Sequence, residues 1–137
     1  MYTNALKTAQ LELSLDRNDP FGWFNLGSSL TGLRRYEDAV SAFDEARSLG
    51  LPSRFLWYQF TIFDAYLKVG GDYNDEVIVL ADDVLTKKQS EEAFYYKGMA
   101  YQAQGKLDEA RKQYRLALRF NKNYTAAQQA LDALGDS

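Results

Sequence analysis

The sequence contains neither cysteine nor histidine among its 137 residues. Without cysteine there is no disulfide and no thiolate nucleophile, and without histidine there is no imidazole base and no imidazole metal ligand. The side chains that remain for chemistry are carboxylates, lysine, tyrosine and hydroxyls. We therefore expect a protein that is not an enzyme, has no metal site and needs no cofactor.

Proline is scarce as well, at two residues, and no apolar run approaches the length of a membrane-spanning helix. The net charge of −3 and the pI near 5.0 give no general attraction to nucleic acid or to an anionic membrane. The first residues do not have the pattern of a signal peptide. We therefore expect neither nucleic acid nor membrane as a partner, and we take the cytoplasm as the default compartment.

Apolar and small residues recur in two stretches at a constant separation of 71 positions. Gly27 corresponds to Gly98, and Phe43 corresponds to Tyr114. The same offset joins Leu30, Tyr36, Ala39 and Ala46 to Tyr101, Leu107, Ala110 and Ala117. A constant offset marks an internal repeat, and stacked repeats present surfaces to partners rather than pockets for chemistry.

The repeated spacing has a counterpart in a known family. Trp23, Leu26 and Gly27, followed by Ala39 and Phe43, resemble the pattern of the tetratricopeptide repeat, a helix–turn–helix unit of about 34 residues. Residues 20–53 and 91–124 are the two clear copies. The resemblance implies an all-α fold, a right-handed α-solenoid of three such repeats.

The third repeat expected between the clear copies, over 54–90, is degenerate. Gly70-Gly71 resembles an insertion, and after it Val77, Ala81 and Val84 fit the small-residue stripe better than their neighbours do. The register of this copy stays open in the sequence.

Two flanking segments complete a single expected domain over 1–137. Residues 4–16 resemble the second helix of a repeat whose first helix is missing, and 125–135 predict a capping helix. A start inside a half repeat favours a fragment of a longer chain, which could be exported, so the absence of a leader carries little weight.

Local signals agree with helices in the first copy. Asp19-Pro20 is a helix start, with a side chain that can accept amide hydrogen bonds and a proline in the first turn. Glycine inside a helix costs about 1 kcal/mol relative to alanine. We therefore expect Gly27 and Gly98 to be buried where a second helix approaches closely, against Ala39 and Ala110.

Two clusters of charge have competing interpretations. The acidic residues Asp72, Asp75, Glu76, Asp82 and Asp83 lack the spacing of a calcium loop, so we expect a solvated turn and helix start. The basic residues Arg111, Arg115, Arg119 and Lys122 recur at helical spacing. They predict a solvated helix face, with a patch for phosphate or an acidic partner as the alternative.

The resemblance also implies a binding surface, because the first helices of these repeats line a concave groove that holds a peptide. The residues it places there are Phe21, Phe24, Asn25 and Ser28, then Trp57, Phe60 and Asp64, then Glu92, Tyr95, Met99 and Gln102. We expect Phe24, Phe60 and Tyr95 to be accessible on one side. The alternative is that these aromatic residues are simply buried.

The expected function is non-catalytic binding of a protein or peptide segment in this aromatic-lined groove. A weaker resemblance, over residues 46–60, is to the repeat region attached to some bacterial cysteine peptidases that cleave after double glycine. It implies a second hypothesis, an accessory domain that positions the substrate of a larger enzyme. Self-association through the open N-terminal end is a third.

Overall fold

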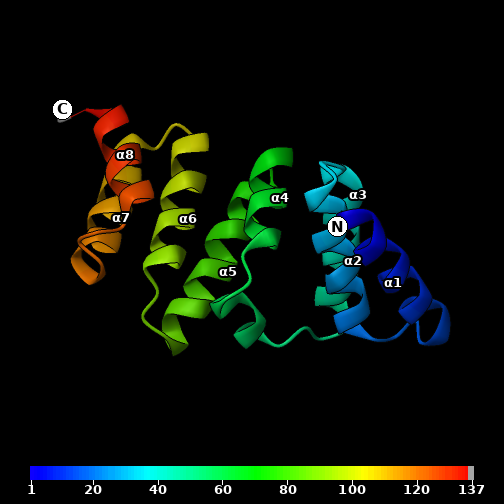
Figure 1. Ribbon diagram of the computed structural model, residues 1–137. Coiled ribbons are helices and arrows are strands. Elements are labelled where there is room, and N and C mark those ends of the chain that lie inside the picture. Colours follow the sequence, from blue (N-terminus) through cyan, green and yellow to red (C-terminus); the bar gives the residue numbers. More distant parts are fainter. Residues whose placement is uncertain (136–137) are drawn as a thin grey trace. The chain divides into compact units, whose positions relative to one another are not determined.

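The structure is a computed structural model that describes residues 1–135, and every regular element in this range is a helix. The all-α fold expected from the sequence is confirmed (Figure 1). In chain order the helices are α1 (Tyr2–Leu15), α2 (Pro20–Gly32), α3 (Tyr36–Ser48), the 3₁₀ helix η1 (Ser53–Trp57), α4 (Thr61–Val69), α5 (Tyr73–Lys87), α6 (Glu91–Ala103), α7 (Leu107–Phe120) and α8 (Thr125–Leu134).

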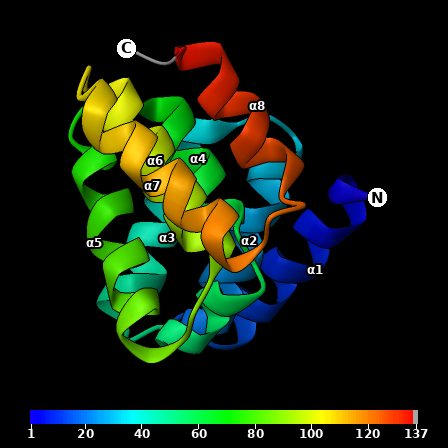
Figure 2. The ribbon, with the colours of Figure 1, turned by 90° about the vertical axis from the view of Figure 1, so that its left-hand side faces the viewer.

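The chain divides into two compact units, each with its own core. Unit 1 is Met1–Val69 and contains α1 to α4, and unit 2 begins at Gly70 and contains α5 to α8. In unit 1, α2 packs against α1, α3 and α4, and α3 also packs against α4. In unit 2, α6 packs against α5 and α7, and α7 packs against α8 (Figure 2). Short turns reverse the chain between α2 and α3 and between α6 and α7, so that each pair is an antiparallel hairpin.

The predicted helix start at Asp19-Pro20 is confirmed. The Asp19 Oδ1 atom accepts a hydrogen bond of 2.9 Å from the Phe21 amide, and Pro20 is the first residue of α2. Ser90 has the same role for α6, where its hydroxyl oxygen accepts from the Ala93 amide at 3.1 Å. Each cap satisfies one of the amides that the first turn of a helix leaves without a partner.

The two mid-helix glycines are buried, as predicted, but the group that approaches them is different. A Cβ atom added to Gly27 would lie 2.7 Å from the ring of Phe43, and one added to Gly98 would lie 2.5 Å from the ring of Tyr114. The expected neighbours, Ala39 and Ala110, are also fully buried, but they are not the nearest side chains. The glycines therefore make room for a flat aromatic ring one turn further along the second helix.

The middle repeat differs from the other two in its first helix. The expected segment begins as the 3₁₀ helix η1 and is interrupted before α4, so Trp57 and Phe60 lie outside α4. Phe55 in η1 stacks on Phe21 at a centroid distance of 4.8 Å and contacts Phe24 at 5.6 Å. These ring contacts join η1 to α2 within unit 1.

The second helix of the middle repeat follows the expected pattern. Val77, Ala81 and Val84 are all fully buried on α5, as the small-residue stripe predicts. The acidic residues Asp75 and Glu76 lie in the first turn of α5, where their charge is favourable for the helix dipole. The boundary between the two units, after Val69, falls inside residues 54–90, the segment assigned to this repeat. The division of the chain into repeats stays a prediction.

Candidate interaction surface

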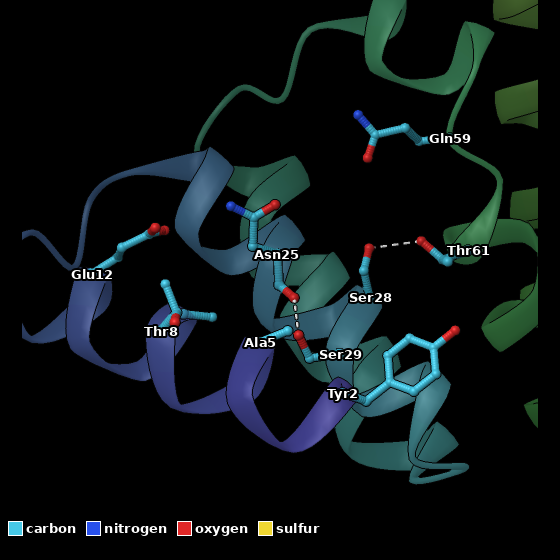
Figure 3. A pocket seen from close by; sticks show the side chains of 10 residues that line it. Tyr2, Ala5, Thr8, Glu12, Asn25, Ser28, Ser29, Gln59 and Thr61 are labelled. Carbon is cyan, nitrogen blue, oxygen red and sulfur yellow. Dashed lines mark hydrogen bonds between the residues drawn. The ribbon is translucent and has the colours of Figure 1, made fainter.

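Unit 1 has an open hollow of about 370 Å³ beside α2 (Figure 3). Its walls are more apolar than polar. α1 contributes one wall, α2 the floor and the segment before and at the start of α4 the far rim. The residues that line it are Tyr2, Ala5, Thr8, Ala9 and Glu12 from α1, Asn25, Ser28 and Ser29 from α2, and Gln59 and Thr61.

The floor of the hollow is held by short hydrogen bonds. The hydroxyls of Ser28 and Thr61 are 2.7 Å apart and join α2 to α4. The Ser29 hydroxyl donates to the Asn25 carbonyl at 2.9 Å, within α2. The side-chain amides of Asn25 and Gln59 are exposed and make no hydrogen bond within the described part of the chain. Each amide can donate and accept, so the hollow presents polar groups that a ligand could pair with beside its apolar surface.

The sequence placed four residues of unit 1's first repeat in a groove, and the structure separates them. Asn25 and Ser28 line the hollow. Phe21 is 40% exposed, with its ring stacked on Phe55. The expectation that Phe24 is accessible is wrong, because its side chain is 0% exposed and packs against Phe43 at 5.3 Å and against Phe55. Phe24 belongs to the core of unit 1.

The residues predicted from the middle repeat also have different surroundings. Trp57 and Phe60 are half-buried on either side of the break between η1 and α4, and Asp64 is exposed on α4. Gln59, which lies between the two aromatic residues, reaches the hollow instead.

In unit 2, the predicted residues of α6 are all half-buried. The ring of Tyr95 lies 5.3 Å from that of Tyr96 and 5.7 Å from that of Tyr124, both in edge-on geometry. The side-chain oxygen Oε1 of Gln102 accepts a hydrogen bond of 2.7 Å from the Tyr114 hydroxyl, so this side chain supports a core tyrosine. Glu92 accepts from the Ser90 hydroxyl at 3.2 Å, and Met99 is half-buried beside them on α6. A binding role for these residues stays a prediction.

Sequence reasoning missed the wall of the hollow that α1 provides. Thr8 and Glu12 are one helical turn apart and point into the hollow with Tyr2 (Figure 3). The sequence did contain a signal for this wall. Ala5 and Ala9 are four positions apart, as are Thr8 and Glu12, and residues four apart share one face of a helix. Gln59 carried no signal, since it lies in a break that no periodicity predicts.

Two buried tyrosines have strongly perturbed titration, and both are structural. The Tyr66 hydroxyl donates to Asp44 Oδ1 at 2.5 Å and accepts from Arg47 at 3.2 Å, joining α4 to α3. Burial, and then the hydrogen bond to Asp44, raises the pKa of Tyr66 above its usual range. Burial, and then the neighbouring Tyr95, likewise raises the pKa of Tyr114. Neither of these two tyrosines lines the hollow.

The predicted basic stripe on α7 is not uniform. Arg115, Arg119 and Lys122 are exposed, as the solvated-face interpretation requires. Arg111 is buried instead, because its guanidinium donates to the carbonyls of Leu134 and Gly135, at the end of α8, at 3.0 and 3.2 Å. A third hydrogen bond of 2.9 Å joins it to Asp108. Arg111 therefore caps α8 and is not available to a phosphate.

Within residues 1–135, no group of acidic side chains is arranged to hold a metal ion. The helices of this described range are also too short or too polar for any of them to cross a membrane.

Comparison with known proteins agrees with the repeat pattern. Two segments, residues 22–49 and residues 91–124, match models of the tetratricopeptide repeat. A solved structure, the MamA RS-1 ArsTM double mutant, is similar over 97% of this chain and 73% of its own length, with a TM-score of 0.81 at 20% identity. A search of the curated proteins gave no match. Tetratricopeptide repeats form protein–protein interaction modules, and this is the functional class of the two matched segments. Residues 22–49 and 91–124 are therefore tetratricopeptide repeats, within a helical fold that the chain shares with the MamA structure.

Proposed function

We propose that this chain is a non-catalytic binding module that holds a segment of another protein in the hollow of unit 1. The observation that carries the proposal is the hollow itself, whose walls are more apolar than polar and which contains two exposed amides, Asn25 and Gln59. Apolar surface supplies affinity, and a few fixed polar groups supply orientation and specificity. Asn25 and Ser28 lie on α2, a first helix of the kind that the family resemblance assigns to binding.

The proposal is narrower than an aromatic-lined groove along three repeats. Phe24 supports the hollow from the core and does not contact a partner, since it is fully buried. Polar contacts to the bound segment would come mainly from the Asn25 and Gln59 amides, because Ser28 is already joined to Thr61. We expect the Asn25 amide to pair with the backbone of the bound segment.

The experiment is a selection of peptides from a random displayed library on the full chain, followed by calorimetry on the best binders. Asn25→Ala should weaken binding about two- to tenfold, the range expected for the loss of one or two hydrogen bonds. Asn4→Ala is the matched control, because Asn4 is an exposed asparagine within α1 that does not line the hollow. Selected peptides that bind the Asn25→Ala variant as tightly as the wild type would show that the hollow is not the site.

A further inference from the structure

A row of exposed cations follows α7 in unit 2. Between Ala110 and Leu131 the sequence contains five basic residues and no acidic residue, although the whole chain has a net charge of −3. One of the five, Arg111, is buried in the cap of α8. The other four are exposed and form the basic row, which consists of Lys112, Arg115, Arg119 and Lys122.

The helix brings the basic row together on the side that faces away from the core. With 3.6 residues per turn, Lys112, Arg115 and Arg119 lie within about 60° around the axis of α7 and within about 10 Å along it. Lys122 follows two residues after the end of the helix. The residues of α7 that are buried in the core, such as Tyr114, lie on the opposite side. The four charges therefore form one continuous cationic surface.

No member of the basic row has an ion pair within residues 1–135. Other helical cations of this chain do, as Arg35 does with a carboxylate three positions further on. In the row only Lys112 has acidic residues within four positions, and these are Asp108 and Glu109. Asp108 pairs instead with Arg111, at 2.9 Å. The charge of the row is therefore not neutralised by neighbouring side chains in this range.

The repeat fold does not require the basic row. The offset of 71 positions relates the row to α3 and the residue that follows Gly50, where the matched residues are Ser41, Asp44, Ser48 and Leu51. None of these is basic, and α3 still forms a hairpin with α2. Like charges three or four positions apart destabilise a helix, and only Arg119, in the last turn, gains from the helix dipole. An anion bound along the row would relieve this repulsion.

We propose that the basic row of α7 binds a short acidic segment of a partner protein. The site is in unit 2 and shares no residue with the hollow of unit 1, so the inference goes beyond the proposed function. The chemistry of the segment follows from charge complementarity, since guanidinium groups hold carboxylates through paired hydrogen bonds. The row is about 15 Å long, a distance that an extended segment covers with about five residues.

A nucleic acid fits this surface less well than a short acidic segment does. The affinity of a protein for nucleic acid depends on the number of phosphates that it neutralises. Beyond its N-terminal end the row is followed by Asp108 and Glu109, whose exposed carboxylates would repel a longer polyanion. Single strands also need free aromatic rings for stacking, and Phe120, the exposed ring of α7, already stacks on Phe94 at 5.6 Å.

The acidic residues of this chain are less suitable for the basic row than those of another protein. In the acidic cluster on α5, Asp82 pairs with Lys97 at 2.7 Å. Asp83 pairs with Lys87, also at 2.7 Å. A second copy that docked α5 on the row would exchange these ion pairs for new ones. A segment whose carboxylates are in water gives up no ion pair when it binds.

The probe for the test is hexaglutamate, acetylated at its N-terminus and amidated at its C-terminus so that only its side chains are charged. It is titrated into the ¹⁵N-labelled full chain at about 50 mM salt and followed by two-dimensional NMR. We expect saturable shifts of the amide signals of residues 111–122. Hexaglutamine with the same blocked ends is the matched control and should give no saturable shift. Salt at about 300 mM should weaken hexaglutamate binding, because exposed charges are screened.

Chain variants decide whether the basic row holds the peptide. Arg115→Gln combined with Arg119→Gln removes two charges from the row and should weaken binding about fivefold. Lys7→Gln combined with Arg54→Gln removes the same charge from exposed positions of unit 1 and should leave the affinity unchanged. Arg115→Lys combined with Arg119→Lys keeps the charge and should retain most of the affinity. All four positions are exposed, so circular dichroism should show the same helical content in every variant.

The inference fails if hexaglutamate gives no saturable shift in residues 111–122, if hexaglutamine binds as well, or if the double glutamine variant of the row binds as tightly as the wild type. Three further results would also overturn it by assigning the row to another partner. A single-stranded oligothymidylate of equal charge that binds the row more tightly than hexaglutamate would assign it to nucleic acid. Sedimentation with phosphatidylserine vesicles that the double glutamine variant abolishes would assign it to a membrane. A salt-sensitive dimer that this variant abolishes would assign it to a second copy.

Discussion

Replacement of Gly98 by alanine tests whether the glycine of the repeat is required by the ring of Tyr114. A Cβ atom at this position would lie 2.5 Å from the ring, about 1 Å closer than carbon atoms pack. The ring cannot move away freely, because it is fully buried and its hydroxyl donates to Gln102 at 2.7 Å. Overpacking of this kind costs about 1–3 kcal/mol.

The helix propensity of alanine opposes this loss of stability. Alanine is favoured over glycine inside a helix by about 1 kcal/mol. The net effect of Gly98→Ala is therefore a loss of about 1 kcal/mol of unfolding free energy, or about 4 °C in melting temperature for a chain of this size. In a Tyr114→Leu background the ring is absent, so the same substitution should stabilise the chain by about 1 kcal/mol.

Urea titrations followed by far-UV circular dichroism give the four free energies of this cycle. The expected coupling between positions 98 and 114 is about 2 kcal/mol, well above the error for residues that do not touch. The pair Gly27 and Phe43 in unit 1 provides an independent repetition, with the added Cβ atom 2.7 Å from the ring. The reasoning would be refuted if Gly98→Ala had the same effect on stability in both backgrounds.

Three further predictions concern single side chains. Stability should fall above pH about 10, because unfolded tyrosine loses a proton that buried Tyr66 keeps. Tyr66 alone contributes a slope of up to about 1.4 kcal/mol per pH unit. In urea titrations Tyr66→Phe should make the slope shallower between pH 10 and 12, and an unchanged slope would contradict the raised pKa. Arg111→Ala should lower the free energy of unfolding by about 2 kcal/mol and speed amide hydrogen exchange in α8, because the carbonyls of Leu134 and Gly135 lose their charged donor. Unaltered exchange in α8 would rule out the cap. Ser90→Ala should lower the unfolding free energy by about 1 kcal/mol through loss of the α6 cap, and a change near zero would show that the cap is dispensable.

The fold was predictable from the sequence because the spacing of a few residues repeats along the chain. Gly27 and Gly98 each require a close neighbour, and the aromatic residue that fills the space follows at the same distance in both copies. Such a pair constrains two helices at once, so its repetition predicts a helical hairpin and then its stacking. The identity of the neighbour was not predictable, because Ala39 and Phe43 lie on the same buried face of α3 and periodicity alone does not rank them.

The failure at Phe24 has a specific cause. Its position on α2 is adjacent both to the stripe that faces α3 and to the stripe that faces outward, so helical periodicity permits either. In the structure the rings of Phe43 and Phe55 pack against Phe24, and Phe55 lies in η1, where the first helix of the middle repeat is interrupted. An interruption of this kind depends on which rings pack together in three dimensions, and no regular sequence pattern reports it.

The hollow was harder to predict than any single residue, since three separate segments form it: α1, α2 and the residues around the start of α4. A motif search finds side chains of distinctive chemistry, and Ala5 and Thr8 have none. Gln59 reaches the hollow from the break between η1 and α4, which helical periodicity does not predict. A surface of this kind depends on where segments distant in the sequence meet, so only the folded chain shows which of its polar groups lie together.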